Sequence, residues 1–177
     1  MESDRTKEFT TLFEKHADEL FRHCVLRISD RERALDITQE TFLRALKYAD
    51  NGTTIKNYRS FLYRILNNLI IDEYRKWKTQ SLDDLLENEE YTDVAENELL
   101  RDPIDALEDA MLRFDGERAM HALEELPEHY RSVIVLRYID GLSPSEISNI
   151  TGENENAVSV RIHRGLKKLR AILEKKP

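Results

Sequence analysis

Residues 143–170 read SPSEISNITGENENAVSVRIHRGLKKLR, and this stretch decides the architecture of the last third of the chain. The run Ser143-Pro144-Ser145-Glu146 has the pattern of a capping box, which starts a helix. Gly152 predicts the end of that helix after about two turns, because glycine readily takes the left-handed conformation found at helix ends. A second helix is predicted to begin at Asn154 or Asn156, because asparagine favours the N-cap position.

The second helix of this pair has an apolar side and a cationic side. Its apolar residues follow each other at steps of four, four and three positions, which is the spacing of a buried helical seam. They are Val158, Ile162, Leu166 and Leu169. The basic residues lie off that seam, and residues 156–170 contain no carboxylate. A short helix, a glycine turn and a longer helix with a cationic front are typical of a helix–turn–helix motif.

The cationic front suits duplex DNA. Arg161, Arg164 and Lys168 project to one side of the helix, because they are three and four positions apart. Arginine grips a guanine edge with two hydrogen bonds, whereas lysine more often meets phosphate. A merely solvated helix is the alternative, and the capping box and turn favour DNA over it. The residues expected to face DNA are Asn156, Ser159, Arg161, Arg164, Lys167 and Lys168.

Charge divides the chain into three parts. The whole chain of 177 residues carries a formal net charge of −8. Residues 79–117 contain fourteen Asp or Glu and two Arg, a net of −12, whereas residues 56–78 carry +4 and residues 154–177 carry +5. Two basic segments are therefore separated by an acidic one, and the overall charge conceals both.

The helical pattern extends over most of the chain, in which Gly and Pro are scarce. In the first block we expect three helices: one with apolar residues from Phe9 to Cys24, one capped by Asp30, and one from Tyr58 towards Trp77. Asp50-Asn51-Gly52 predicts the loop before the third helix. The residues expected near the buried side of the second helix are Ala34, Ile37, Thr41, Leu43 and Leu46.

The last block is predicted to contain three or four short helices. Pro127 is expected to be the first residue of a helix that includes Val133 to Ile139, and Asp140-Gly141 is expected to end it. The sequence as a whole predicts an all-α protein. We expect two small helical domains, residues 1–78 and 116–177, joined by an acidic flexible linker over residues 79–115 that contains one or two weak helical pieces, for instance around Asp105–Leu112.

The basic segment at residues 56–78 has a different chemistry from the last helix. Aromatic residues alternate with cations, a combination that binds single-stranded DNA by stacking and charge. The aromatics are Tyr58, Phe61, Tyr63, Tyr74 and Trp77, and the cations are Arg59, Arg64, Arg75, Lys76 and Lys78. Asn67 and Asn68 interrupt an apolar helix, and an amide facing a cleft would bond a base edge. In the alternative interpretation the rings are core and the Asn pair faces solvent.

Other function classes receive little support. No apolar run is long enough to cross a bilayer, and the polar N-terminus does not resemble an export signal, so we expect a cytoplasmic protein without membrane insertion. Phosphate-binding glycine loops and nucleophile elbows are absent from the sequence. His16, His23 and Cys24 are expected to be core or surface residues rather than metal ligands. We therefore expect neither an enzyme nor a cofactor.

Three motifs in order resemble the extracytoplasmic-function group of bacterial RNA polymerase sigma factors. They are DITQETFLRAL (36–46), YRSFLYRILNNLIIDEYRK (58–76) and LEELPEHYRSVIVLRYIDGLSPSEISNITGENENAVSVRIHRGLKKLR (123–170). The resemblance covers nearly the whole chain except the linker. It implies that residues 1–78 form a sigma2-like helical bundle and residues 116–177 a sigma4-like helix–turn–helix domain. Such a protein would bind core RNA polymerase and direct promoter-specific transcription initiation.

The resemblance also implies roles for individual residues. Those matching the helix that docks on the β′ clamp helices of the polymerase are Asp36, Gln39, Glu40, Leu43 and Leu46. Those matching the surface that recognises and melts the minus-ten element are Arg64, Asn67, Asn68, Asp72, Arg75 and Lys76. The resemblance adds Val160 to the six residues that are expected to face duplex DNA, because it matches the helix that reads the minus-thirty-five element. The implied partners are promoter DNA, core polymerase through its β′ clamp and β flap, and an anti-sigma factor. The alternative is a helix–turn–helix regulator that does not join the polymerase as a sigma subunit.

Overall fold

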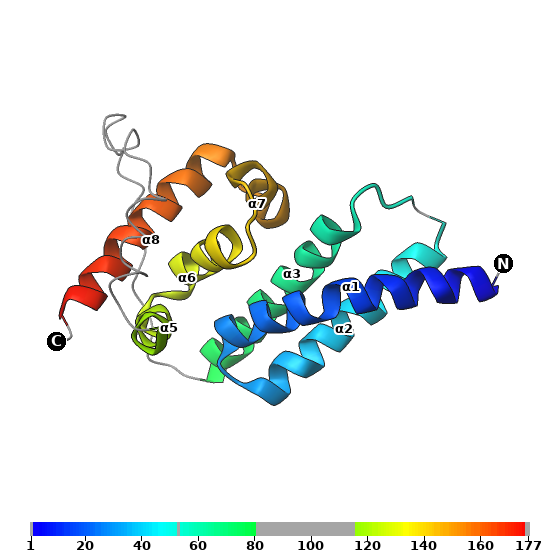
Figure 1. Cartoon of the computed structure of the whole chain (residues 1–177), viewed down its shortest axis with the longest axis horizontal. Coiled ribbons are helices and arrows are strands. Elements are labelled where there is room, and N and C mark those ends of the chain that lie inside the picture. Colours follow the sequence, from blue (N-terminus) through cyan, green and yellow to red (C-terminus); the bar gives the residue numbers. More distant parts are fainter. Residues whose placement is uncertain (1, 53, 81–115, 176–177) are drawn as a thin grey trace. The chain divides into compact units, whose positions relative to one another are not determined.

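The computed structural model describes residues 2–52, 54–80 and 116–175, in which the regular structure is helical and no strand occurs (Figure 1). This confirms the all-α prediction for these residues. The helices are α1 (Glu2–Ile28), α2 (Arg31–Asp50), α3 (Tyr58–Gln80), α5 (Gly116–Glu125), α6 (Glu128–Ile134), η2 (Val135–Ile139), α7 (Pro144–Thr151) and α8 (Glu155–Lys175). Apart from the last two residues of α3, the predicted linker, with its weak helix at Asp105–Leu112, lies outside the described residues.

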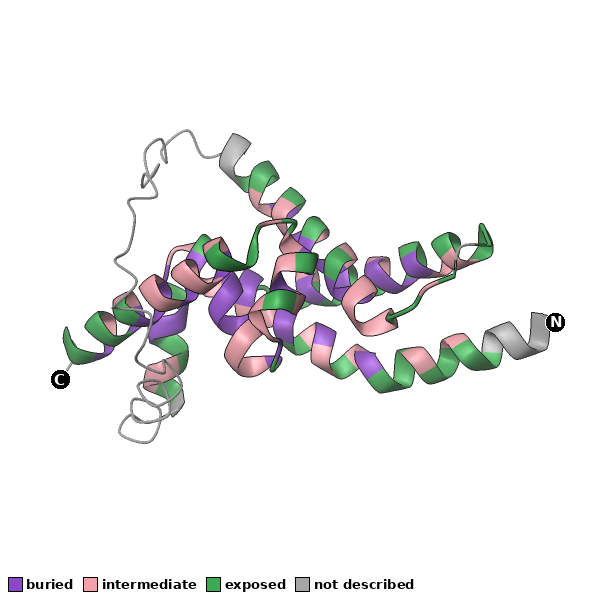
Figure 2. Ribbon diagram, turned by 90° about the horizontal axis from the view of Figure 1, so that it is seen from above, coloured by how far each residue is buried: buried purple, intermediate pink, exposed green. Residues whose placement is uncertain are grey.

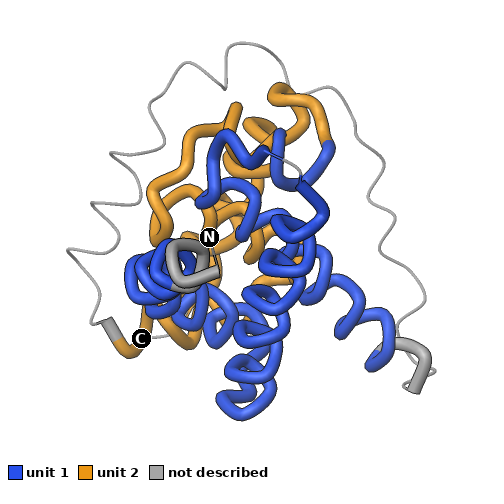
Figure 3. The backbone as a smooth tube through the Cα atoms, turned by 90° about the vertical axis from the view of Figure 1, so that its right-hand side faces the viewer, with its two compact units in different colours: residues 1–85, 149–152 blue, residues 86–148, 153–177 orange. Residues whose placement is uncertain are grey.

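The chain forms two compact units, coloured separately in Figure 3. The first contains residues 1–85 and 149–152, and the second contains residues 86–148 and 153–177. In the first unit α1, α2 and α3 pack against one another. Buried residues, which are purple in Figure 2, occur on all three helices and form the core of this unit. They include Leu20, Cys24, Ile28, Ala34, Ile37, Phe42, Ala45, Leu62, Leu66 and Ile70.

Local signals set the ends of α2 as predicted. The Asp30 side chain accepts a hydrogen bond of 3.0 Å from the backbone N–H of Arg33, which is the N-cap interaction. At the other end Gly52 has a φ of +78°, a conformation that glycine adopts without a steric penalty. The predicted cap and loop are therefore both confirmed.

The prediction of the buried side of α2 is partly wrong. Ala34, Ile37 and Thr41 are buried, but Leu43 is 52% exposed and Leu46 is half-buried. The buried arc is completed instead by Thr38, Phe42 and Ala45. At about 100° per residue Leu43 falls on the opposite side of the helix from this arc. Threonine is tolerated in the core because its hydroxyl donates to the preceding turn, as Thr41 does to the carbonyl of Ile37 at 2.8 Å.

A partly buried ion pair joins α2 to α3. Arg33 donates two hydrogen bonds to the carboxylate of Glu73, from Nε to Oε1 at 2.7 Å and from Nη2 to Oε2 at 2.6 Å. Glu73 is 7% exposed. The hydrogen bonds from Arg33 outweigh burial and hold the pKa of Glu73 below its ordinary value of 4.5. Because the folded pKa is the lower one, this pair stabilises the fold fully above pH 4.5, and the stabilisation is lost as the pH falls through the folded pKa.

Glu73→Gln is therefore expected to lower the free energy of unfolding at pH 7 by about 1–2 kcal/mol. The variant should also lose less stability than the wild type between pH 7 and pH 3, because it lacks the carboxyl group whose pKa is lowered in the folded state. Urea unfolding of the two proteins at both pH values measures the difference. Glu14→Gln, an exposed position on α1, is the matched control. An identical pH dependence in wild type and Glu73→Gln would contradict the assignment.

The second unit begins its α6 helix one residue later than predicted. Pro127 is the N-cap, with φ −52° and ψ 142°, rather than the first helical residue. Its extended ψ places it outside the helix, although its fixed φ still suits this position. After Ile134 the helix widens into the π-helical segment η2, where the N–H of Asp140 bonds the carbonyl of Val135 at 3.0 Å. Gly141, with a φ of +71°, follows the end of η2 as predicted.

The capping box before α7 is confirmed. The backbone N–H of Ser143 donates to Oε2 of Glu146 at 2.8 Å, and the N–H of Glu146 donates to Oγ of Ser143 at 3.2 Å. Gly152 has a φ of +77° and lies in the turn after α7. Asn154, and not Asn156, caps α8, because its side chain accepts from the N–H of Ala157 at 2.7 Å.

Gly165 allows α8 to approach α6 closely. A Cβ at this position would lie 3.2 Å from Cγ1 of Ile134 and 3.4 Å from Cβ of Tyr130. We expect Gly165→Leu to destabilise the second unit by about 1–3 kcal/mol, because it overfills the contact. Gly165→Ala should be closer to neutral, because its better helix propensity, worth about 1 kcal/mol, offsets a smaller clash. Chemical denaturation of both variants measures their free energies of unfolding. A Gly165→Leu variant as stable as the wild type would contradict the close approach of α8 to α6.

Candidate nucleic-acid interface

The first candidate surface lies on α8. The predicted seam is confirmed, because Val158, Ile162, Leu166 and Leu169 are all buried. α6 and α5 pack against α8. All the predicted contact residues lie off the seam: Asn156 and Lys167 are exposed, and Ser159, Val160, Arg161, Arg164 and Lys168 are half-buried. These seven residues are called the α8 face below.

Cations of the α8 face interact with residues of the second unit. Nζ of Lys168 lies 5.0 Å from the centre of the Tyr130 ring, within the range of a cation–π interaction. Arg161 bonds the carboxylate of Glu153 with both terminal nitrogens. Sequence reasoning missed Glu153. It precedes α8 and is eight positions from Arg161, so no helical spacing links the two residues.

The second candidate surface lies on α3. Arg64, Asn68, Asp72, Arg75 and Lys76 are all exposed, and the first four follow each other at steps of four, four and three. They form one stripe along the helix, called the α3 face below. Arg75 lies 3.7 Å from the carboxylate of Asp72, and this pair is exposed to solvent. The α3 face therefore offers an amide, a carboxylate and three cations to a partner.

Asn67 is not on this stripe. It is 3% exposed, and its Oδ1 accepts a hydrogen bond of 2.8 Å from Nη1 of the buried Arg27. The hydroxyl of Tyr74 donates to the carbonyl of Arg27, which ties α1 to α3 a second time. The amide of Asn67 therefore serves the interior of the bundle in this structure, while the next residue, Asn68, faces outward.

The aromatic residues of α3 are mostly part of the bundle. Tyr63 is fully buried, and Tyr58, Phe61 and Tyr74 are half-buried. Only Trp77 among the five is classed as exposed, at 38%. For Tyr63 the structure thus agrees with the interpretation of these rings as core. Sequence periodicity alone did not separate the two interpretations, because cations and rings alternate on both sides of the helix.

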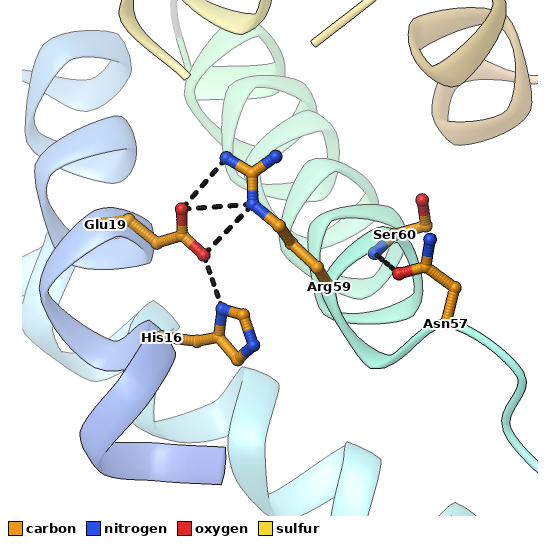
Figure 4. A network of polar contacts seen from close by, with 5 residues as sticks. All are labelled: His16, Glu19, Asn57, Arg59 and Ser60. Carbon is orange, nitrogen blue, oxygen red and sulfur yellow. Dashed lines mark hydrogen bonds and ion pairs between the residues drawn. The ribbon is translucent and has the colours of Figure 1, made fainter. Parts of the chain in front are cut away.

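Arg59 is held by an acidic partner from α1, as Figure 4 shows. Its Nη2 donates to Oε2 of Glu19 at 2.9 Å, and its Nε lies within 3.2 Å of both carboxylate oxygens. His16 contacts the same carboxylate from one turn earlier in α1. Burial raises the pKa of Glu19, but the hydrogen bonds from Arg59 and His16 outweigh it and leave the pKa below its ordinary value. Arg59 thus links α3 to α1.

A pocket of about 950 Å³ lies beside this network. Its walls come from the first half of α1, the end of α2, and residues 54–59. The lining combines the rings of Phe9 and Tyr58 with the cations of Lys15 and Lys56 and with the apolar Leu46. Sequence reasoning missed the pocket, because its lining comes from segments that are far apart in the chain.

The third candidate surface lies on α2. Asp36, Gln39 and Leu43 are exposed, and Glu40 and Leu46 are half-buried. Glu40 accepts a hydrogen bond of 2.8 Å from Arg44, one turn further on. Leu35, which the sequence analysis did not select, is 48% exposed on the same side. Two exposed leucines beside acidic and amide groups form the α2 face: Leu35, Asp36, Gln39, Glu40 and Leu43.

Comparison with known proteins matches both units to one class. Residues 12–79 match the family model described as sigma-70 region 2, and residues 116–169 match sigma-70 region 4. A solved structure of the sigma factor RpoE with the anti-sigma factor NepR from Bartonella quintana is similar in fold. It has a TM-score of 0.69 at 20% identity, and the match covers 97% of this chain and 99% of that one. Residues 12–79 therefore correspond to sigma-70 region 2 and residues 116–169 to sigma-70 region 4.

Relatives define the group within that class. The sigma factor SigV of Bacillus subtilis is 32% identical over 166 residues, which cover 93% of this chain and 90% of SigV. The extracytoplasmic-function sigma factor SigW of the same organism is 34% identical over 171 residues, covering 93% of this chain and 88% of SigW. This chain belongs to the extracytoplasmic-function group of RNA polymerase sigma factors. Within its described residues, no helix is long and apolar enough to cross a membrane.

Proposed function

We infer that this chain acts as a sigma subunit, which binds core RNA polymerase and directs promoter-specific transcription initiation. The observation that carries this inference is the presence of regions 2 and 4, in that order, in one chain with relatives along more than nine-tenths of its length. A helix–turn–helix regulator would leave the region 2 match without a role. As a sigma subunit the chain performs no chemistry itself and works in the cytoplasm beside the polymerase.

We place the minus-thirty-five contacts on the α8 face, within the domain of residues 116–177. Arg164 and Ser159 would meet base edges, and Lys167 would meet phosphate, because lysine acts as a point charge and arginine as a planar donor. Asn156 lies in the first turn of α8, where a recognition helix approaches the major groove. The Asn154 cap and the buried seam of α8 support this assignment, because they fix where the recognition helix starts and which side of it faces outward.

We place the minus-ten contacts on the α3 face, within the domain of residues 1–78. Arg64, Arg75 and Lys76 would hold the phosphate backbone, and Asn68 would bond an unpaired base. Asn67 would act indirectly: its bond to Arg27 fixes the rotation of α3 and so presents Asn68 to solvent. The acidic linker over residues 79–115 would join the two domains.

We place the contact with the β′ clamp helices of the polymerase on the α2 face. Exposed leucines flanked by acidic and amide groups suit a partner helix that carries arginine. Leu46 would lie at the edge of this docking surface, since its side chain also lines the pocket beside α1. The β flap and an anti-sigma factor are further partners that membership of this group implies.

Run-off transcription tests the proposed function. Purified core polymerase with this chain should initiate from specific sites on genomic fragments of the source organism, and core polymerase alone should not. A regulator would act only when another sigma factor is also present. A chain that neither associates with core polymerase nor starts a transcript would contradict the proposal.

A further inference from the structure

A rigid turn places one carboxylate against the recognition helix. Glu153 lies between Gly152, whose φ is +77°, and the N-cap Asn154. Its backbone carbonyl accepts a hydrogen bond of 2.6 Å from the hydroxyl of Ser148 in α7. The backbone of Glu153 is thus held between the glycine turn and the start of α8.

The carboxylate of Glu153 meets the guanidinium of Arg161 end-on. Nη1 of Arg161 donates to Oε1 at 2.8 Å, and Nη2 donates to Oε2. The side chains are only 14% exposed for Arg161 and 29% exposed for Glu153, so solvent screens this pair less than a surface pair. Both terminal nitrogens of the guanidinium donate in this pair, and a guanidinium carries five N–H donors in a fixed plane.

Pairing changes what Arg161 offers to DNA. An arginine without a carboxylate partner is attracted to any phosphate, and this attraction carries no sequence information. With its charge neutralised by Glu153, Arg161 keeps directional donors but loses most of its attraction for the backbone. A guanine edge, which presents two acceptors in one plane, suits such a fixed donor group.

We propose that Glu153 is a specificity-determining residue of minus-thirty-five recognition, which holds and neutralises Arg161 so that this arginine contacts a base edge rather than phosphate. The proposal rests on the proposed function of the α8 face. Other cations of that face, such as Lys167, supply the attraction for the backbone. Glu153 itself acts through Arg161 and is a positioning residue.

Glu153→Gln tests the proposal, because glutamine keeps the shape and one acceptor but removes the charge. The bond from Ser148 is to the backbone, so it survives the change. Glu155→Gln is the matched control: it removes the same charge from an exposed position in the first turn of α8. Arg161→Ala and the double variant Glu153→Gln/Arg161→Ala complete a double-mutant cycle.

Two measurements are made on the full-length chain. Holoenzyme assembled with each variant transcribes a promoter library randomised over the minus-thirty-five element, and the transcribed templates are sequenced. The free chain is titrated with duplex DNA of random sequence at several salt concentrations. For Glu153→Gln we expect a base preference weakened about five- to a hundredfold at one position. We also expect a log–log salt slope steeper by about 0.9, because one more phosphate contact forms.

The control and the double variant give the decisive outcomes. Glu155→Gln should keep the wild-type base preference, and Glu153→Gln should have no effect on preference once Arg161 is alanine. If wild-type holoenzyme shows a preference that Glu153→Gln retains, the proposal is overturned while the sigma function stands. If the wild-type chain starts no transcript with core polymerase, the proposed function fails and this proposal fails with it.

Discussion

Leu43→Lys is expected to weaken binding to core RNA polymerase about a hundredfold or more. Leu43 is a large apolar side chain that is 52% exposed in the described structure, and it is the last residue of the α2 face. We expect Leu43 to be a hot spot of the interface, a position where loss of the side chain costs about 2 kcal/mol or more, and a cation facing the arginines expected on the partner adds repulsion. Titration of labelled protein with core polymerase, read by fluorescence anisotropy, measures the loss.

The fold should tolerate this change. Leu43 lies opposite the buried arc of α2, so the substitution removes little core packing, and a lysine three positions after Glu40 forms a favourable pair on the helix. Met120→Lys, at an apolar position that is 41% exposed on α5, is the matched control for the new charge. Equal core affinity for the two variants, with thermal unfolding unchanged, would contradict the placement of the docking surface on α2.

Elements whose geometry depends on neighbours in sequence were predictable. The cap at Asp30, the capping box of α7 and the stop at Gly152 each involve residues at most a few positions apart, so the pattern contains the whole interaction. The seam of α8 was equally predictable, because one apolar stripe on a helix of this length has only one way to be buried. The order of the two units followed from the motifs that these elements carry.

The side of α2 that is buried was less predictable, because α2 has apolar residues on both sides. Phe42 and Leu43 are adjacent, yet Phe42 is buried and its ring centre lies 4.8 Å from that of Phe13 in α1, while Leu43 is exposed. The sequence of α2 alone does not distinguish a leucine that packs in the core from one that is exposed and would contact a partner. Only the positions of α1 and α3 do so.

The burial of polar residues inside the bundle was also not predictable from the sequence. Asn67 and Asn68 look equivalent in sequence, but the first is used by Arg27 from α1 and the second faces solvent. A buried amide needs a partner, and here the partner is forty residues away, beyond the reach of any local pattern. The pair of Glu153 and Arg161 was missed for a related reason, since a turn rather than a helix brings the two side chains together.

Asn68→Ala and Arg164→Ala are expected to fail at different steps of initiation. Arg164→Ala should weaken binding of holoenzyme to duplex promoter about tenfold, since one arginine contact to a base is worth about 1–3 kcal/mol. Asn68→Ala should leave duplex binding within about twofold and slow promoter opening about tenfold. It removes an amide that meets a base only after the strands separate.

Gel retardation on ice measures duplex binding, and the fluorescence of 2-aminopurine in the minus-ten element measures opening. Arg170→Ala, exposed further along α8 and paired with Glu174 at 2.9 Å, is the control for Arg164. Asn51→Ala, exposed after α2, is the control for Asn68. Both controls should behave as wild type.

A promoter with an unpaired minus-ten bubble separates the two roles further. Because the bubble no longer has to be melted, the transcription defect of Asn68→Ala should shrink on it, whereas the defect of Arg164→Ala should persist. The exposed position of Asn68 and the buried seam of α8 predict this difference, since each substitution changes one surface and leaves its helix in place. Equal defects of the two variants on duplex and bubble templates would contradict the assignment of melting to α3 and of duplex recognition to α8.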